Sequence, residues 1–189
     1  MSERNTEDIV FGGKIGEIVH TTQPDGRVFE RYRRPPGTRL VIVTPDNKLI
    51  MSREHRQETG GVDLRLPGGK VRDTLEEYHA LLASGQDIAL AASEAAAKES
   101  SEEVGVTVRG LNLIAKANSG ATVEWDLYYF MTNDYEENID GQNLERGEEI
   151  ERAQLAPAEI RQAITNGEMQ EWRSVGVLLG IVLPQLETT

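Results

Sequence analysis

Three glutamates, Glu99, Glu102 and Glu103, stand at positions i, i+3 and i+4 of one stretch of the chain. On an α-helix this spacing places the three carboxylates on one face, within reach of a shared ion. Like charges held this closely repel one another unless a cation lies between them. Hard divalent ions such as Mg²⁺ take oxygen ligands of this kind and often hold substrate phosphates as well. The spacing therefore indicates a phosphate-processing site, whereas the plainer interpretation is a solvated helix surface.

Two neighbouring features favour the functional interpretation. A glycine turn, Leu66–Gly69, lies upstream, and Gly105 follows the glutamates at the position where helices commonly end. The helix face opposite the carboxylates carries small side chains, which allow close approach of a backbone. These side chains are Ala91, Ala92, Ala95 and Ala96. We therefore expect the helix to pack against the glycine turn.

The residues between the turn and the glutamates predict one extra helix. Thr74–Glu77 is a capping-box sequence that begins a helix. Its expected apolar side consists of Leu75, Tyr78, Leu81 and Leu82. Residues 84–87 break this helix, and Asp87 is expected to cap a second helix. The second helix, from about Ile88 to Val104, carries the carboxylates.

These features together resemble the signature of the Nudix hydrolases, G-x5-E-x7-R-E-U-x-E-E-x-G-U, in which U is an aliphatic residue. Glu99, Glu102 and Glu103 match three glutamates of that signature. Gly105 matches its last glycine, and Lys98 stands where the signature has arginine. The resemblance implies a metal-dependent hydrolase of nucleoside diphosphates that are linked to another group.

The chain departs from this signature between Gly69 and Lys98, where about 15 residues are inserted. Ser100 stands at an aliphatic position of the signature. The first glutamate of the signature has no clear counterpart. The candidates for its place are Glu76, Glu77 and Glu94. The extra helix accounts for the inserted length, which lengthens the loop without excluding the site.

The resemblance implies an α/β (α+β) fold, the Nudix α/β/α sandwich, with a mixed sheet between the carboxylate helix and the C-terminal helices. A small N-terminal β extension is expected to precede it. We expect a tail and β-hairpin at residues 1–37 and a Nudix domain at 38–189, with the helical insertion at about 72–87.

Apolar alternation and turn residues predict the remaining elements. Residues 1–10 are expected to form a mobile tail. Strands and helices are expected at 14–20, 27–32, 38–44, 48–53, 106–115, 121–132, 149–155, 156–166 and 168–183. One of four clustered aromatic residues is expected to line a substrate pocket, while the others pack in the core. These residues are Trp125, Tyr128, Tyr129 and Phe130.

The residues before the glycine turn resemble the ADP-ribose pyrophosphatase branch, in which a Q-Y-R-like triplet precedes an E-L-P-A/G-G turn. His55 and Arg56 match the end of the triplet, whereas Arg65 stands where that branch has glutamate. The resemblance implies hydrolysis of ADP-ribose or another ADP-sugar to AMP and a sugar phosphate. The alternatives are hydrolysis of (d)NTPs or dinucleoside polyphosphates, and a nucleotide-sensing module without catalysis.

The resemblance also implies the ligands of Mg²⁺ or Mn²⁺. They are the backbone carbonyl of Gly68 and the carboxylates of Glu99, Glu102 and Glu103. The catalytic candidates are Glu102, Glu103 and Glu148. Glu103 or a glutamate of the acidic segment 134–149 would orient or deprotonate the attacking water. Within that segment Glu148 is the best match, with Glu145 and Glu149 beside it, although such a charge run by itself predicts a solvated flexible loop.

Three cations are candidates for substrate binding. Arg56 is expected to bind a phosphate or to cap a loop carbonyl. Arg34 belongs to a basic cluster with Arg31 and Arg33, which either protects a strand edge or holds substrate phosphates or a partner subunit. Lys98 is the third candidate, and we expect it to orient the carboxylates rather than to contact substrate.

The composition limits the setting of this chemistry. A chain of 189 residues is long enough for one compact domain. Its net charge of −12 argues against nucleic-acid binding, and it requires a metal ion or a cationic pocket wherever phosphates bind. The absence of cysteine and of a membrane-length apolar run favours a soluble cytoplasmic protein with no membrane partner. The resemblance implies a homodimer that shares its N-terminal strands.

Overall fold

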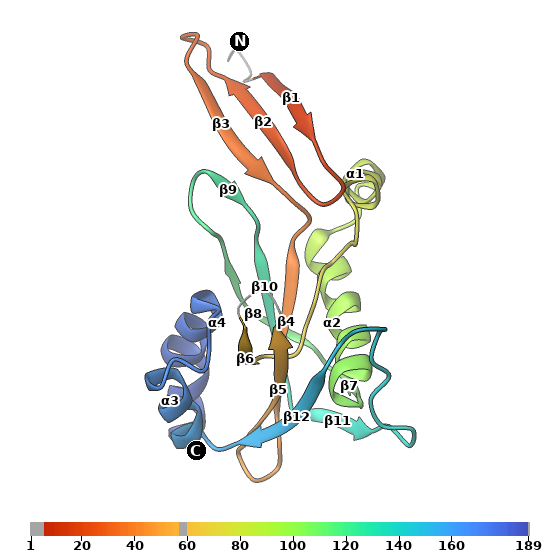
Figure 1. Cartoon of the computed structure of the whole chain (residues 1–189), viewed down its shortest axis with the longest axis vertical. Coiled ribbons are helices and arrows are strands. Elements are labelled where there is room, and N and C mark those ends of the chain that lie inside the picture. The colour runs from red at the N-terminus through yellow and green to blue at the C-terminus, as the bar shows by residue number, and fades with distance from the viewer. Residues whose placement is uncertain (1–5, 57–59, 189) are drawn as a thin grey trace.

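A mixed β-sheet lies at the centre of the molecule, between a long helix and the C-terminal helices (Figure 1). The computed structural model describes residues 6–56 and 60–188. The described strands of this sheet, in spatial order, are β12 (Ile150–Leu155), β5 (Leu49–Arg56), β4 (Gly37–Val43), β10 (Leu127–Thr132) and β8 (Asn112–Ala117), with β6 (Gly61–Arg65) paired to β5. Strands β4 and β10 pair in parallel, whereas the other neighbours are antiparallel.

Strand β4 is buried along its whole length, because helices cover both faces of the sheet. Its alternate side chains enter two apolar cores. Leu40 and Ile42 pack with the helices that follow the glycine turn, whereas Val41 and Val43 pack with the C-terminal helices. This arrangement confirms the predicted α/β/α sandwich with a mixed sheet.

The predicted extra helix forms as α1, Leu75–Ser84. Thr74 and Glu77 make both hydrogen bonds of the capping box at its start. The side chains that it buries are Leu75, Tyr78 and Leu81. Leu82, expected on the same apolar side, is 43% exposed.

The carboxylate helix forms as α2, Ile88–Val104. The Asp87 side chain caps its first turn by accepting a hydrogen bond from the Ala89 N–H at 2.9 Å. Gly105 ends the helix with a left-handed φ of 68°, which a glycine adopts without strain. The local sequence signals therefore define this helix correctly at both ends.

The C-terminal region is less regular than the sequence predicts. Helix α3 (Pro157–Thr165) forms as expected. The helix predicted from residue 168 instead begins later, because the Glu171 side chain caps the N–H groups of Arg173 and Ser174. It continues as α4 (Trp172–Val177), the π-helix η1 (Leu178–Val182) and α5 (Leu183–Glu187). In the described part of the chain, no helix is long and apolar enough to cross a membrane.

A second sheet forms the N-terminal extension at the upper end of Figure 1. Its described strands, in order, are β1 (Thr6–Gly12), β2 (Glu17–Thr22), β3 (Val28–Arg33) and β9 (Val123–Glu124). The predicted hairpin corresponds to β2 and β3. The prediction of a mobile tail is wrong for residues 6–10, which pair with β2, and residues 1–5 lie outside the described part. Strand β1 is held on the sheet by its pairing with β2 and by the Glu7 carboxylate, which accepts hydrogen bonds from Arg31 and Arg33.

Two long strands predicted after α2 are each divided in two. The first is interrupted at Gly110 (φ 59°), which separates β7 (Val106–Arg109) from β8. The second is divided at residues 125–126, so that β9 joins the extension and β10 joins the central sheet. The prediction of a loop from residue 134 is also wrong at its start, because β11 (Asp134–Glu137) pairs with β7.

Candidate active site

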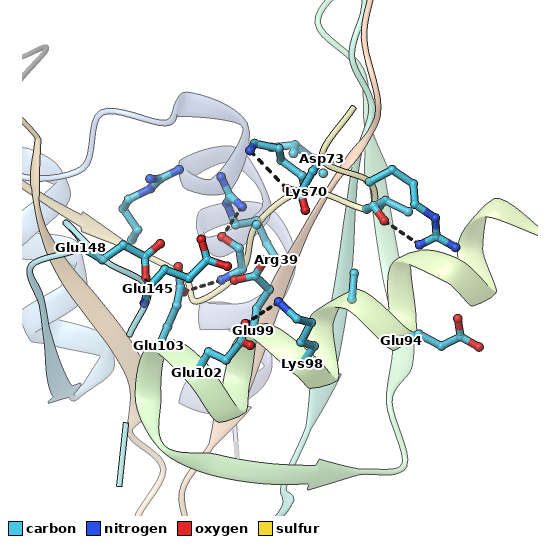
Figure 2. A pocket seen from close by; sticks show the side chains of 18 of the residues that line it. Arg39, Lys70, Asp73, Glu94, Lys98, Glu99, Glu102, Glu103, Glu145 and Glu148 are labelled. Atoms are coloured by element: carbon cyan, nitrogen blue, oxygen red, sulfur yellow. Dashed lines mark hydrogen bonds and ion pairs between the residues drawn. The ribbon is translucent and has the colours of Figure 1, made fainter. Parts of the chain in front are cut away.

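Helix α2 and the glycine turn meet beside the start of β4, where the Thr38 N–H donates to the Gly69 carbonyl oxygen. The Gly68 N–H donates a hydrogen bond to Glu103 Oε2 at 2.8 Å. Gly69 lies so close to Glu99 that a Cβ atom there would be 2.0 Å from the Glu99 carboxylate. Figure 2 shows Glu99, Glu102 and Glu103 on one side of α2. The predicted packing of this helix against the turn is confirmed, although the carboxylates and not the alanines face the turn.

The alanines of α2 have a different partner. Ala91, Ala92 and Ala96 are fully buried in the core that includes Leu40 and Ile42 of β4. Ala95, predicted to share their face, instead lines the same pocket as the glutamates. Small side chains on this face let the helix lie close to the sheet. That close contact in turn brings the carboxylate face level with the glycine turn.

Gly68 is required by both conformation and space. Its φ of 142° disfavours any residue with a side chain, and a Cβ atom would lie 2.3 Å from the Thr38 carbonyl oxygen. Since a backbone atom cannot move aside cheaply, the strand or the turn would have to shift. The residue therefore holds the turn against β4 at the distance that Glu103 uses.

We expect Gly68→Ala to destabilise the protein by about 2–4 kcal/mol, combining overpacking with backbone strain. Urea unfolding followed by circular dichroism would measure the change. Gly176→Ala is the matched control, because Gly176 lies in helix α4 and a Cβ atom there would meet no atom within 4 Å. A Gly68→Ala protein as stable as the control would contradict the tight packing of the turn.

Burial dominates the electrostatics of two of the glutamates. It raises the pKa of Glu99 from 4.5 to about 7, with the negative charges of Glu102 and Glu148 acting in the same direction. Burial likewise raises the pKa of Glu103 to about 8, although the hydrogen bond from Gly68 opposes it. Among the described residues, no hydrogen-bond or ion-pair partner contacts the Glu99 side chain. These carboxylates therefore have too little positive charge beside them to remain ionised easily.

Glu102 has a cationic partner. Lys98 Nζ lies 2.7 Å from Glu102 Oε2, and this hydrogen bond is the main cause that raises the lysine pKa. Lys98 therefore contacts a carboxylate, as expected. As these side chains are placed, no three Asp, Glu or His residues in the described ranges converge on one point where a metal ion could bind. The oxygen donors suit a hard divalent ion, but Glu102 would have to turn away from Lys98 to join them.

Arg39 is a site residue that sequence reasoning missed. Its buried guanidinium Nη1 donates to the carbonyl oxygens of Gly68 at 2.8 Å and Thr38 at 2.7 Å. The carbonyl predicted to bind metal thus already accepts one hydrogen bond. Arg39 also lowers the pKa of both Glu99 and Glu103, without offsetting their burial. An arginine within an otherwise apolar, β-branched strand was the signal for it in the sequence.

The acidic segment reaches the same site from the other side. Its backbone is anchored to the end of α2, since the Asn143 N–H donates to the Glu102 carbonyl oxygen at 3.0 Å. Glu145 and Glu148 line the pocket, and the Glu148 carboxylate accepts a hydrogen bond from the Glu145 N–H at 2.9 Å (Figure 2). Glu149 does not line it and is 80% exposed. The structure thus separates two candidates of this segment from the third.

The turn, the three glutamates of α2, Lys98, Arg39, Glu145 and Glu148 line one pocket of about 650 Å³. Its cationic residues are Arg34, Arg39, Arg65, Lys70, Arg72 and Lys98. Its acidic residues are Glu54, Asp73, Glu77, Glu94, Glu99, Glu102, Glu103, Glu145 and Glu148. The pocket therefore combines oxygen donors for cations with basic groups for an anionic ligand.

The other predicted residues are distributed as follows. Trp125 is the aromatic residue of the cluster that lines the pocket, whereas the three that follow it in β10 are buried in the cores. Of the candidates for the missing first glutamate, Glu94 lines the pocket, Glu77 lines it but is used in the capping box, and Glu76 is outside it. Arg56 ends β5, and its side chain lies outside the described part.

A pair of residues that sequence reasoning did not assign to the site, Glu54 and Arg65, lies on β5 and β6. Arg65 Nη1 donates to Glu54 Oε2 at 2.5 Å, and both side chains are largely buried in the pocket wall. Glu54 also raises the pKa of Glu103. Arg65 therefore places a carboxylate from the adjacent strand beside the site, and only the pairing of these strands reveals it.

Comparisons with known proteins agree with the observed architecture. No protein-family model matches the sequence, and no curated protein matches it. A solved structure of an ADP compounds hydrolase is similar over 100% of this chain and 97% of the other, with a TM-score of 0.68 and 20% sequence identity. At this level of identity the similarity shows a shared fold.

Proposed function

We propose that this protein hydrolyses a nucleoside diphosphate linked to another group, with ADP-ribose or a related ADP-sugar as substrate, in the cytoplasm. One observation carries the proposal. A helix presents Glu99, Glu102 and Glu103 to a tight glycine turn inside a pocket that also contains basic groups. The resemblance to the Nudix signature and the fold shared with an ADP compounds hydrolase support the same chemistry.

The residues of the pocket have separate roles in this proposal. Glu99, Glu102 and Glu103 would hold Mg²⁺ or Mn²⁺, with the second lone pair of the Gly68 carbonyl as a further donor. When bound, the ions would neutralise the diphosphate and acidify a water molecule. Arg39 keeps the glycine turn in place by bonding its carbonyl. Lys98 holds the Glu102 carboxylate, which would have to leave this lysine in order to bind a metal ion.

The reaction forms one bond and breaks one. The oxygen of water bonds to one phosphorus, and the phosphoanhydride bond breaks, so that the products are AMP and a sugar phosphate. Glu103 or Glu148 would orient the water or take its proton. Glu148 is suitable for this role because its carboxylate reaches the pocket from a separate segment and its position is fixed by Glu145.

A substrate panel tests the proposal directly. The purified protein would be incubated with Mg²⁺ and, separately, with ADP-ribose, ADP-glucose, a dinucleoside polyphosphate and a set of nucleoside triphosphates. Chromatography would then identify the products. We expect AMP and ribose phosphate from ADP-ribose. Turnover of triphosphates or dinucleoside polyphosphates alone would replace the proposed substrate class with one of these.

A catalytically inactive, nucleotide-sensing protein is the second candidate. It is favoured by the ion pair that occupies Glu102, by the hydrogen bond on the Gly68 carbonyl and by the lack of a ready three-ligand site among the described side chains. Calorimetric titration with ADP-ribose separates the two candidates. Binding without turnover in either Mg²⁺ or Mn²⁺ would establish the sensor.

We also propose a homodimer formed through the N-terminal extension. All residues of β1 are exposed, and β1 is an edge strand, so its outer backbone groups are free to pair with another strand. Exposed large apolar side chains gather on the extension and its turns. They are Ile9, Val10, Phe11, Ile15, Val28 and Phe29. A surface of this kind is typical of a subunit interface.

We expect light scattering coupled to size-exclusion chromatography to give twice the mass of the 21.0 kDa chain. Phe11→Asp should shift the protein toward monomer, because it places a charge in the apolar patch. Leu113→Asp is the matched control, since Leu113 is similarly exposed but lies on β8. A monomeric wild-type protein at micromolar concentration would contradict the proposed interface.

A further inference from the structure

Arg34 differs from the two arginines that precede it in β3. Arg31 and Arg33 use their guanidinium groups to bind carboxylates on other strands of the extension, namely Glu7, Glu17 and Glu124. The Arg34 side chain has no hydrogen-bond or ion-pair partner among the described residues. Its Cζ lies 4.4 Å from the ring centroid of Trp125, and both residues line the pocket. The N–H donors of Arg34 are therefore available to a ligand.

Trp125 is held from outside the pocket by Arg173. The Arg173 Cζ lies 4.2 Å from the Trp125 ring centroid, and its Nη1 donates to the Trp125 carbonyl oxygen at 2.7 Å. The same nitrogen donates to Ser119 Oγ at 2.9 Å. Arg173 is not part of the pocket lining. It therefore fixes both the ring and the backbone of Trp125 without reaching the ligand space.

Glu171 in turn fixes Arg173. The Arg173 Nε donates to Glu171 Oε1 at 2.8 Å, and the two side chains are only 15% and 19% exposed. Glu171 Oε2 accepts hydrogen bonds from the Ser174 N–H at 2.8 Å and from the buried Tyr129 hydroxyl at 3.1 Å. Both ends of the carboxylate are thus occupied. The start of α4 is a rigid support behind the Trp125 side of the pocket.

The supported wall lies directly beside the glycine turn. A Cβ atom on Gly37 would be 3.1 Å from the Gly69 carbonyl oxygen and 3.8 Å from Trp125 Nε1. Gly69 in turn lies against the Glu99 carboxylate, on the side where a residue with a side chain would carry its Cβ atom. The start of β4, at Gly37, therefore lies between the glutamates of α2 and the Trp125 ring on which Arg34 stacks.

We propose that Glu171 and Arg173 are positioning residues, which fix Trp125 and thereby hold Arg34 for a phosphate group of the nucleotide. This inference rests on the proposed function and specifies how the pocket binds its substrate. A pocket with many carboxylates repels a diphosphate, and an unpaired guanidinium beside them offsets that repulsion. Stacking on a fixed ring keeps its donors in one orientation, so that less freedom is lost on binding.

A double-mutant cycle tests the inference without catalysis. Calorimetry would measure the affinity for ADP in the absence of divalent metal, and adenosine would be the ligand without phosphates. We expect Arg34→Met to weaken ADP binding about 10-fold or more and Arg173→Met about 5-fold. The double variant should bind ADP no more weakly than Arg34→Met, because Arg173 acts through Arg34. Adenosine binding should not change.

Two further variants separate positioning from general damage. Trp125→Phe should retain ADP affinity within about twofold, since an aromatic face remains, whereas Trp125→Leu should resemble Arg173→Met. Arg161→Met is the control, because Arg161 pairs with Glu187 on other helices, and it should leave ADP affinity unchanged. Where active protein is assayed, Arg173→Met should raise KM for ADP-ribose with kcat within about twofold.

The outcomes distinguish this inference from the proposed function. Additive effects of Arg34→Met and Arg173→Met, equal losses for adenosine and ADP, or wild-type ADP affinity of Trp125→Leu would each overturn the positioning role. Hydrolysis could still occur in any of these cases. If no nucleotide is hydrolysed but the cycle is non-additive, the hydrolase proposal fails and the positioning role remains.

Discussion

We expect Glu103→Gln to lower ADP-ribose hydrolysis at least about 100-fold while the fold stays intact or gains stability. The substitution keeps the shape of the side chain and an oxygen that can accept the Gly68 N–H. It removes a negative charge from a buried position, where that charge is costly. Loss of activity with retained stability would show that the charge serves catalysis and not folding.

The measurement compares kcat in saturating Mg²⁺ and the thermal unfolding of the same preparations. Glu102→Gln should lose activity to a similar extent, because it is expected to bind metal once it leaves Lys98. Glu76→Gln is the matched control, since Glu76 is exposed on α1 and does not line the pocket. Full activity of either Glu102→Gln or Glu103→Gln would contradict the assignment of these residues to metal binding.

The parts of this site that could be predicted from sequence are those determined by local interactions. The caps of α2, Asp87 and Gly105, act within a few residues, and helical periodicity alone places Glu99, Glu102 and Glu103 on one face. The glycine turn is also a local signal. These elements form as expected because the residues that define each one are neighbours in the chain.

The remaining site residues depend on strand pairing, which local patterns do not specify. Arg39 reaches Gly68 only because the turn returns beside β4, and Glu54 enters the pocket wall only because β5 pairs with β6. Trp125 lies at the point where one predicted strand divides between two sheets. Long-range interactions also explain why β1 forms despite its polar N-terminal sequence, since arginines on β3 donate hydrogen bonds to Glu7 of β1.

The insertion before α2 leaves the contact between α2 and the glycine turn intact, because α1 packs against the extension, although Arg72, Asp73 and Glu77 of the insertion line the pocket. The Leu75 N–H donates to the Lys14 carbonyl oxygen at 3.1 Å, and His79 Nε2 lies 3.1 Å from Glu17 Oε1. Helix α1 therefore contacts the extension, on the side away from the acidic segment. The added residues extend outward between the turn and α2, whose contact with Gly68 and Gly69 does not depend on them.

The second large effect concerns stability as a function of pH. Glu99 and Glu103 have pKa values of about 7 and about 8 in the folded protein, against 4.5 as their ordinary value. Between about pH 4.5 and pH 8 the folded state therefore holds protons that the unfolded state has released. Stability from these groups is fully present below pH 4.5 and is lost as pH rises through 7 and 8, by up to about 1.4 kcal/mol per pH unit for each group.

A divalent cation should reverse this loss, because it replaces the protons as the partner of the two carboxylates. We expect thermal unfolding without metal to occur at a temperature several degrees lower at pH 8.5 than at pH 5.5. Adding Mg²⁺ should raise the midpoint much more at pH 8.5. In a chain of this size about 3 °C corresponds to 1 kcal/mol.

The double variant Glu99→Gln with Glu103→Gln should lose both this pH dependence and the Mg²⁺ effect. Its glutamine side chains do not titrate, and they carry no negative charge to bind the ion. A Mg²⁺ effect that persists in this variant would place the ion at other residues, and one that is equal at both pH values would mean that protons and metal do not compete for these carboxylates.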